Sequence, residues 1–117
     1  MDIIRTIQAS EEPSRVESYF NGQMTQVCFP LRVKPTKACE GDWLYVIYQG
    51  KVVGRCRIDR LQTFQKPTPI PVGSDGHIIY ARCLVHVQAP GERVPHDKNP
   101  IDARGWVGFR YAPESLW

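Results

Sequence analysis

Hydrophobic and polar residues alternate over several stretches of the chain, which is the periodicity of β-strands. The longest stretch is His77–Val87, where every second residue from Ile79 onward is apolar and faces one side. A second stretch, Trp43–Tyr48, is joined to Lys51–Leu61 by Gln49-Gly50. Two β-rich runs separated by a two-residue turn containing Gly predict a hairpin.

Three further segments have strand patterns, and a fourth has the spacing of a helix. The strand segments are Asp2–Ala9, Gln23–Val33 and Gly105–Tyr111. Ser10 is expected to cap a short helix that Asn21-Gly22 ends, because Ser favours the N-cap and Gly follows helix ends. One face of this helix would be buried, formed by residues three and four positions apart: Val16, Tyr19 and Phe20.

Two segments rich in proline separate the last strands. The segment 67–76 holds Pro67, Pro69 and Pro71 and is predicted to be a loop, because proline cannot donate a ladder hydrogen bond. Residues Gln88–Arg104 hold three more prolines and are predicted to be irregular.

The order of these elements decides the fold class. A doubly wound parallel sheet is excluded, because it needs a helix after nearly every strand. With 117 residues the chain is long enough for one hydrophobic core and short for two, so residues 1–117 are expected to form a single domain. We predict an α+β fold: a small, curved, mostly antiparallel β-barrel with one helix near the N-terminus.

The composition also predicts the location of the protein and the state of its cysteines. No run approaches the roughly 20 apolar residues of a membrane span, so we expect no membrane partner. The N-terminus lacks the features of a signal peptide, and we expect a cytoplasmic location. Four free thiols are then expected, because that compartment keeps cysteines reduced. They are Cys28, Cys39, Cys56 and Cys83.

Metal and cofactor chemistry has no candidate motif in the chain. The four cysteines contain no C-x-x-C pair, and His77, His86 and His96 lack a carboxylate or Cys at an established metal spacing. Cys83 and His86 are three positions apart, which on a strand directs them to opposite faces. We therefore expect neither a metal nor a cofactor.

Positive charge is concentrated in the middle of the chain. The net charge is +3, and the segment Arg32–Lys66 holds eight basic residues against three acidic ones. Such a concentration suits a phosphate-binding surface. It equally suits an edge strand that Lys and Arg protect from further pairing.

Aromatic residues stand near these cations. Trp43 and Trp106 each follow a glycine-containing turn at the start of a strand, and we expect them to be exposed enough to stack on a base. The alternative for the aromatic residues is a place in the core. The candidate phosphate partners beside them are Arg55, Arg57, Arg82 and Arg110.

Three short motifs occur in a distinctive order. Asn21–Thr25 closes the helix and is followed by Arg32; Glu40–Gly54 reads Gly-Asp, an apolar strand, a turn and Val-x-Gly; Gly105–Arg110 reads Gly-Trp-Val-Gly-Phe-Arg. In this order the chain resembles the PUA-like superfamily and, within it, the ASCH and EVE groups, over most of its length. The resemblance implies a β-barrel with a cleft that binds RNA, modified bases or nucleotides.

Some ASCH proteins are small amidohydrolases that act on acylated cytidine. The resemblance to them lies in a Gly-x-Lys-Thr segment, whose Lys acts with a Thr three residues later and a distant Glu. Here the segment reads Gly22-Gln23-Met24-Thr25, with Val27 in the place of the later Thr. Met cannot exchange a proton and Val cannot hydrogen-bond, so we assign no catalytic residue.

The leading hypothesis is a non-catalytic or weakly catalytic module that holds RNA or a nucleotide-like ligand in a cleft with a basic rim. A different class, an amidohydrolase with a rearranged site, would recruit Glu92 or Glu40 with Lys34. A third class is a protein-interaction module that uses the segments 67–76 and 90–100. The residues expected to bind the ligand are Gln23, Thr25, Arg32, Lys34, Trp43, Arg55, Arg57, Arg82, Trp106 and Arg110.

Overall fold

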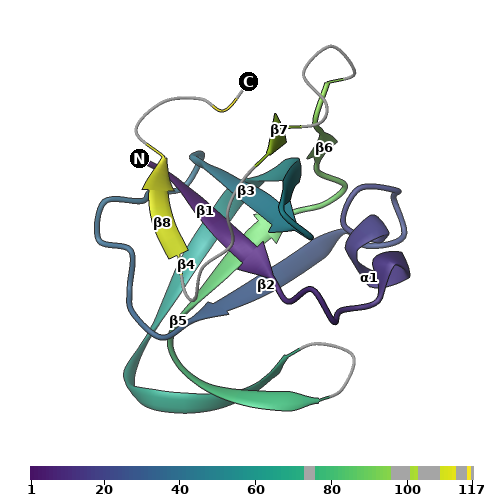
Figure 1. Cartoon of the computed structure of the whole chain (residues 1–117). Coiled ribbons are helices and arrows are strands. Elements are labelled where there is room, and N and C mark those ends of the chain that lie inside the picture. The colour runs from purple at the N-terminus through teal and green to yellow at the C-terminus, as the bar shows by residue number, and fades with distance from the viewer. Residues whose placement is uncertain (73–75, 96–100, 103–108, 113–115, 117) are drawn as a thin grey trace.

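A computed structural model of the protein describes residues 1–72, 76–95, 101–102, 109–112 and 116 (Figure 1). Within these residues, most of the chain is in strands and one short helix stands near the N-terminus. In chain order the elements are β1 (Asp2–Ile7), α1 (Pro13–Glu17), β2 (Gln26–Leu31), β3 (Trp43–Tyr48), β4 (Lys51–Val72), β5 (His77–Gln88), β6 (Glu92–Arg93), β7 (Ile101–Asp102) and β8 (Phe109–Ala112).

The strands form one curled, mixed sheet in the order β2-β5-β4-β3-β1-β8, with the short β6 and β7 added to β4. Every pairing along this order is antiparallel except that of β1 with β3, which is parallel. The expectation of a curved, mostly antiparallel sheet with one early helix is therefore confirmed. Where we predicted a small barrel, the described strands form an open half-barrel whose two ends are β2 and β8 (Figure 1).

The predicted hairpin is confirmed, and its turn explains its sequence. Gln49 and Gly50 both have positive φ, of 51° and 77°. Two positive φ values define the type I′ turn, whose twist matches that of the strands on either side. β3 and β4 then pair from Tyr48 opposite Lys51 outward.

The prediction of a loop at 67–76 was wrong for its proline-rich part. β4 continues to Val72 and pairs with β5 as far as His77, with Pro69 and Pro71 inside the paired segment and Pro67 in the irregular stretch just before it. Pro69 and Pro71 are two positions apart and lack an N–H on the same edge of the strand, so the ladder to β5 can take its donors from Thr68 and Ile70. Residues 73–75 lie outside the described residues.

The other expectations for the second half of the chain have mixed outcomes. The segment Gln88–Arg104, predicted to be irregular, contributes the two-residue strands β6 and β7. β8 confirms only the end of the predicted strand Gly105–Tyr111, since residues 103–108 lie outside the described residues. No helix of the described chain is long and apolar enough to cross a membrane.

The helix is shorter than the sequence pattern suggested. It begins after Glu12 rather than Ser10, because Pro13 with its fixed φ occupies the first turn. The predicted apolar face is nevertheless correct, and it extends past the helix end: Val16, Tyr19 and Phe20 are all buried.

Two glycines let this segment approach the sheet closely. A Cβ on Gly54 of β4 would overlap the ring of Phe20 and stand 2.7 Å from the carbonyl oxygen of Glu92. A Cβ on Gly91 would lie 2.6 Å from the carbonyl oxygen of Arg55. The N–H of Gly91 donates to the carbonyl of Tyr19 at 2.8 Å, which ties the end of the helical segment to the chain after β5.

The buried residues form a large cluster and a smaller second one, the latter made of Tyr45, Ile47, Val52 and Ala112. Residues that alternate along β5 are all buried, as their spacing predicted: Ile79, Ala81, Cys83, Val85 and Val87. All four cysteines are free thiols, as expected; Cys56 and Cys83 are buried, whereas Cys28 and Cys39 are exposed. Burial raises the pKa of the Cys56 thiol to about 12, so this residue packs as a small apolar side chain.

Substituting Gly54→Ala should destabilise the protein, because the added methyl group must displace either Phe20 or the backbone at Glu92. We expect the free energy of unfolding to fall by about 1–3 kcal/mol, the usual cost of overpacking. Urea denaturation measures it. The exposed Thr63 on the same strand provides a control, since Thr63→Ala should change stability by only about 0.5 kcal/mol. Equal stability of the two variants would contradict the packing described here.

Candidate functional site

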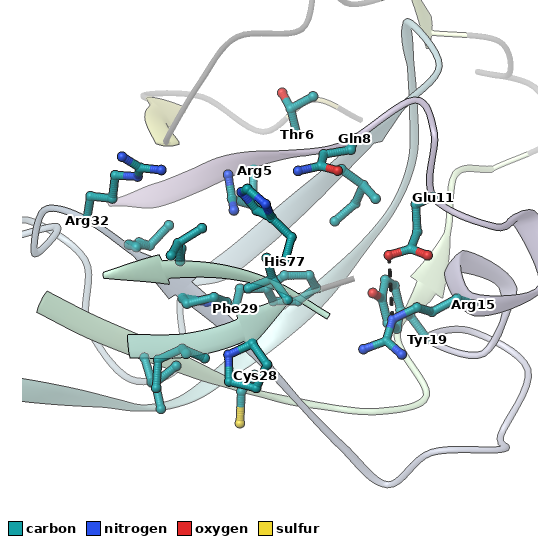
Figure 2. Close-up of a pocket in the computed structure, with 18 residues that line it drawn as sticks. Arg5, Thr6, Gln8, Glu11, Arg15, Tyr19, Cys28, Phe29, Arg32 and His77 are labelled. Carbon is teal, nitrogen blue, oxygen red and sulfur yellow. Dashed lines mark ion pairs between the residues drawn. The ribbon is translucent and has the colours of Figure 1, made fainter. Parts of the chain in front are cut away.

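A cleft of about 380 Å³ lies where the sheet fails to close, between β1 and β2 (Figure 2). β8 pairs with β1 only from Asp2 to Arg5, and β2 pairs with β5 on its other side. The second half of β1 therefore faces β2 without a ladder between them in the described chain. The end of the β4–β5 hairpin and the segment around α1 complete the walls. The volume is that of a site for one small ligand.

The walls of the cleft are largely apolar. β2 contributes Phe29 and Leu31, and the far part of the hairpin contributes Ile70, Val72 and Ile79. Phe29 and Leu31 are buried and belong to the core, while Ile70 and Val72 are partly exposed. A flat apolar group could therefore be covered by the hairpin on one side.

One end of the cleft is cationic. Figure 2 shows Arg5 from β1 and Arg32, just past β2, on the same side of the cleft. Burial lowers the pKa of Arg5 from its ordinary value, and the nearby charge of Arg32 lowers it further. Arg32 is exposed and makes no hydrogen bond or ion pair with other described residues. Two guanidinium groups that repel each other favour an anion between them.

The other end combines a carboxylate, a guanidinium group and a phenol. Arg15 Nε lies 3.7 Å from Glu11 Oε2, and the Glu11 side chain is 7 % exposed against 47 % for Arg15 (Figure 2). Tyr19 is buried, and this burial raises the pKa of its phenol. A carboxylate held in this way can accept hydrogen bonds from a ligand inside the cleft.

Of the ten residues expected to bind a ligand, Arg32 alone among the described ones lines this cleft. Gln23 and Thr25 are exposed between α1 and β2, and Lys34 is exposed just after β2. Trp106 lies outside the described residues. The remaining five are distributed over β3, β4, β5 and β8: Trp43, Arg55, Arg57, Arg82 and Arg110.

Trp43 and its two arginines form a stack of their own. The guanidinium carbons of Arg55 and Arg57 lie 4.0 and 3.6 Å from the Trp43 ring centroid. Arg55 also pairs with Glu92 at 3.0 Å, and Arg57 donates to the carbonyl of Gly41. The arginine charges are thus engaged within the protein, which favours a structural role for Trp43.

Met24 and Val27, which the sequence resemblance sets against catalytic groups of ASCH amidohydrolases, are packing side chains in this structure. Met24 is partly buried against the core, where its sulfur accepts a hydrogen bond from Ser18 Oγ at 3.3 Å. Val27 is buried. Of the residues considered for a rearranged site, Glu92 pairs with Arg55, and neither Glu40 nor Lys34 lines the cleft.

Sequence reasoning missed most of the cleft. Glu11 and Arg15 are only four positions apart, but the fold alone brings them to the same cleft as Arg5 of β1 and Arg32. One signal was available: Arg5 stands at an inward-facing position between Ile3 and Ile7, where a strand beside a core normally carries an apolar residue.

Comparison of the chain with protein-family models, with curated proteins and with solved structures found no match. In the part of the chain that the structure describes, no group of three or more His, Cys, Asp or Glu residues is placed to hold a metal ion.

Substituting Trp43→Leu tests the structural role of the stack. Two cation–π contacts would be lost, and we expect unfolding to become easier by about 1–2 kcal/mol. Urea denaturation gives this quantity, and a nucleotide titration of the same variant should give an affinity within about twofold of the parent chain. Unchanged stability with a large loss of affinity would instead place the ligand on Trp43.

Proposed function

We propose that the protein is a PUA-like binding module whose cleft takes one nucleotide, free or within single-stranded RNA. The observation that carries this proposal is the polarity of the cleft, with two arginines at one end and a buried carboxylate at the other. The resemblance of the sequence to PUA-like domains supports the same class of ligand.

The cationic end suits a phosphate group. Arg32 can place its full guanidinium edge on an anion, because no described side chain competes for it. Arg5, which is more buried, adds charge in a less polar setting. Bringing a dianion between the two relieves their mutual repulsion, so binding is favoured more than with either arginine alone.

The remainder of the cleft suits a base. Ile70 and Val72 line the cleft with apolar side chains, and the Glu11 carboxylate lines the same cleft at the end with Arg15. A carboxylate accepts hydrogen bonds from an exocyclic amino group, as on cytosine or adenine, and repels the carbonyl oxygen found at that position in uracil.

Binding is favoured over hydrolysis by the environment of Met24. The amidohydrolase chemistry needs an ionisable side chain at that position, whereas this chain places a thioether there that contacts Ser18. Our proposal therefore assigns recognition to the cleft and no catalytic step.

Arg32→Gln should weaken nucleotide binding, because it removes the exposed half of the cationic end. We expect at least a tenfold higher Kd for a short fluorescent single-stranded RNA, measured by anisotropy at low salt. The salt dependence of that Kd should also become shallower.

Arg82→Gln is the matched control. It removes the same charge from an exposed position of β5 outside the cleft, where the guanidinium donates to the carbonyl of Gln65. We expect its effect on Kd to stay below about twofold. Equal losses in both variants would point to diffuse electrostatic attraction and would refute a phosphate site in the cleft.

The Glu11 carboxylate leads to a separate prediction, a preference for cytosine over uracil. We expect CMP to bind about tenfold more tightly than UMP, a difference that Glu11→Gln should abolish, because a Gln side chain can present either a donor or an acceptor. Isothermal titration calorimetry gives both constants. Identical affinities for CMP and UMP in the parent chain would show that Glu11 does not contact the base.

A further inference from the structure

A thiol, an imidazole and an amide lie in a row across three neighbouring strands. Cys28 of β2 stands directly opposite His86 of β5, and its Sγ lies 3.0 Å from His86 Nδ1. The other ring nitrogen, Nε2, lies 2.9 Å from Oε1 of Gln62 on β4. Sequence spacing could not reveal this group, because its three members are joined only by strand pairing.

The amide determines which ring nitrogen carries the proton. Oε1 of Gln62 is an acceptor, so Nε2 of His86 is the protonated nitrogen of the neutral ring. Nδ1 then presents a lone pair to the Cys28 thiol, which donates to it. The arrangement has the three roles of an activated nucleophile: an attacking atom, a base in contact with it, and a group that orients the base.

The thiol of this group points away from the nucleotide cleft proposed above. Cys28 is one of the residues of β2 that line the cleft, but Figure 2 shows its sulfur pointing away from Arg5 and His77. Cys28 is exposed, whereas His86 is only 8 % exposed. An incoming reagent can therefore reach the sulfur while the imidazole stays fixed behind it.

The charged neighbours of the pair come from β4. Arg60 stands opposite His86, and its charge lowers the pKa of both His86 and Cys28. The charge of Asp59 raises the pKa of His86. The Asp59 carboxylate accepts hydrogen bonds from the amides of Gln26 and Gln88. Arg60 makes no ion pair with another described residue, so its charge remains available to a reagent at the thiol.

Both members of the pair are neutral at rest. Burial raises the pKa of the Cys28 thiol, with Arg60 opposing this effect. Burial and the charge of Arg60 lower the pKa of His86. The thiol thus keeps its proton at neutral pH, and the imidazole is free to accept it during a reaction.

We propose that Cys28 is a base-assisted nucleophile that undergoes thiol–disulfide exchange with small anionic disulfides, with His86 as the base and Gln62 as the positioning residue. The sulfur of Cys28 attacks one sulfur of the disulfide while the thiol proton passes to Nδ1 of His86. A new S–S bond forms, the old one breaks, and the departing thiolate takes the proton from His86. Cys28 is oxidised to a mixed disulfide, and the released sulfur is reduced to a thiol.

The chain contains its own control in Cys39. Both Cys28 and Cys39 are exposed, but no hydrogen bond of the Cys39 thiol to a base is present among the described residues. In the variant Cys39→Ser the measured thiol reactivity is therefore that of Cys28, and in Cys28→Ser it is that of Cys39. Cys56 and Cys83 are buried and should not react in the folded protein.

The rate of release of nitrothiobenzoate from Ellman's reagent, an anionic aromatic disulfide, tests the proposal. From pH 6.5 to pH 8 the rate should rise steeply for Cys39, because no base is hydrogen-bonded to its thiol among the described residues. For Cys28 it should rise by less than about fivefold, because neutral His86 already accepts the proton throughout this range. The same steep slope at both cysteines would overturn the proposal.

Two substitutions in the Cys39→Ser background extend the test. His86→Asn should slow the reaction at pH 6.5 at least tenfold and restore the steep pH dependence, since Asn offers hydrogen bonds but no base. An unchanged rate in folded His86→Asn would also overturn the proposal. Should that variant fail to fold, the comparison of Cys39→Ser with Cys28→Ser still decides, because both retain His86.

Arg60→Gln tests the choice of an anionic reagent. It should slow the reaction of Cys28 with Ellman's reagent about threefold or more, and leave the reaction with the cationic disulfide cystamine unslowed. Equal slowing with both reagents would refute the preference for an anionic disulfide.

Discussion

The parallel pairing of β1 with β3 is the constraint on which the rest of this fold depends. Parallel neighbours cannot be joined by a tight turn, so residues 8–42 must leave the sheet edge and return to it. On the way the chain covers the core with the segment around α1, and then forms β2, which pairs with β5 at the far end of the sheet. β1 and β2 consequently face each other without a ladder in the described chain, and the cleft occupies the space between them.

How far the sequence predicts such a fold depends on the range of the interactions involved. The β3–β4 hairpin and the alternation along β5 were predicted because a turn and a repeat of two residues are local. The prolines of β4 were misread, because an absent N–H matters only on the edge where a partner lies, and that edge is decided by the whole sheet. The stack of Arg57 on Trp43 could not be predicted either, because it depends on the register that sets the two residues opposite each other.

The prediction of the site was limited in the same way, by how far apart in the sequence the interacting residues lie. Arg32 was identified from the concentration of basic residues, and it does line the cleft. Its partners could not be identified by spacing, because Arg5, Glu11 and Arg32 are separated by segments that the crossover brings back together. The group of Cys28, His86 and Gln62 depends still more on the fold, since each member is on a different strand.

β2 carries two kinds of chemistry because neighbouring residues of a strand face opposite sides. Phe29 and Leu31 point to the core and the cleft, whereas the Cys28 side chain points away and meets His86. An insertion or deletion of one residue in this strand would exchange the two faces, so both depend on the same register. The pairing of β2 with β5 thus maintains the cleft wall and the thiol environment together.

The three prolines of β4 have a consequence for the behaviour of the protein at high concentration. The far part of the β4–β5 hairpin extends from the body of the sheet (Figure 1), and in the described chain only β5 pairs with it. A strand edge of this length would ordinarily recruit a strand from a second molecule and begin aggregation. With Pro69 and Pro71 on that edge and Pro67 just before them, a strand from a second molecule would find acceptors but not the alternate N–H donors that it needs. The hairpin can therefore serve as a long, exposed wall without becoming a template for fibrils.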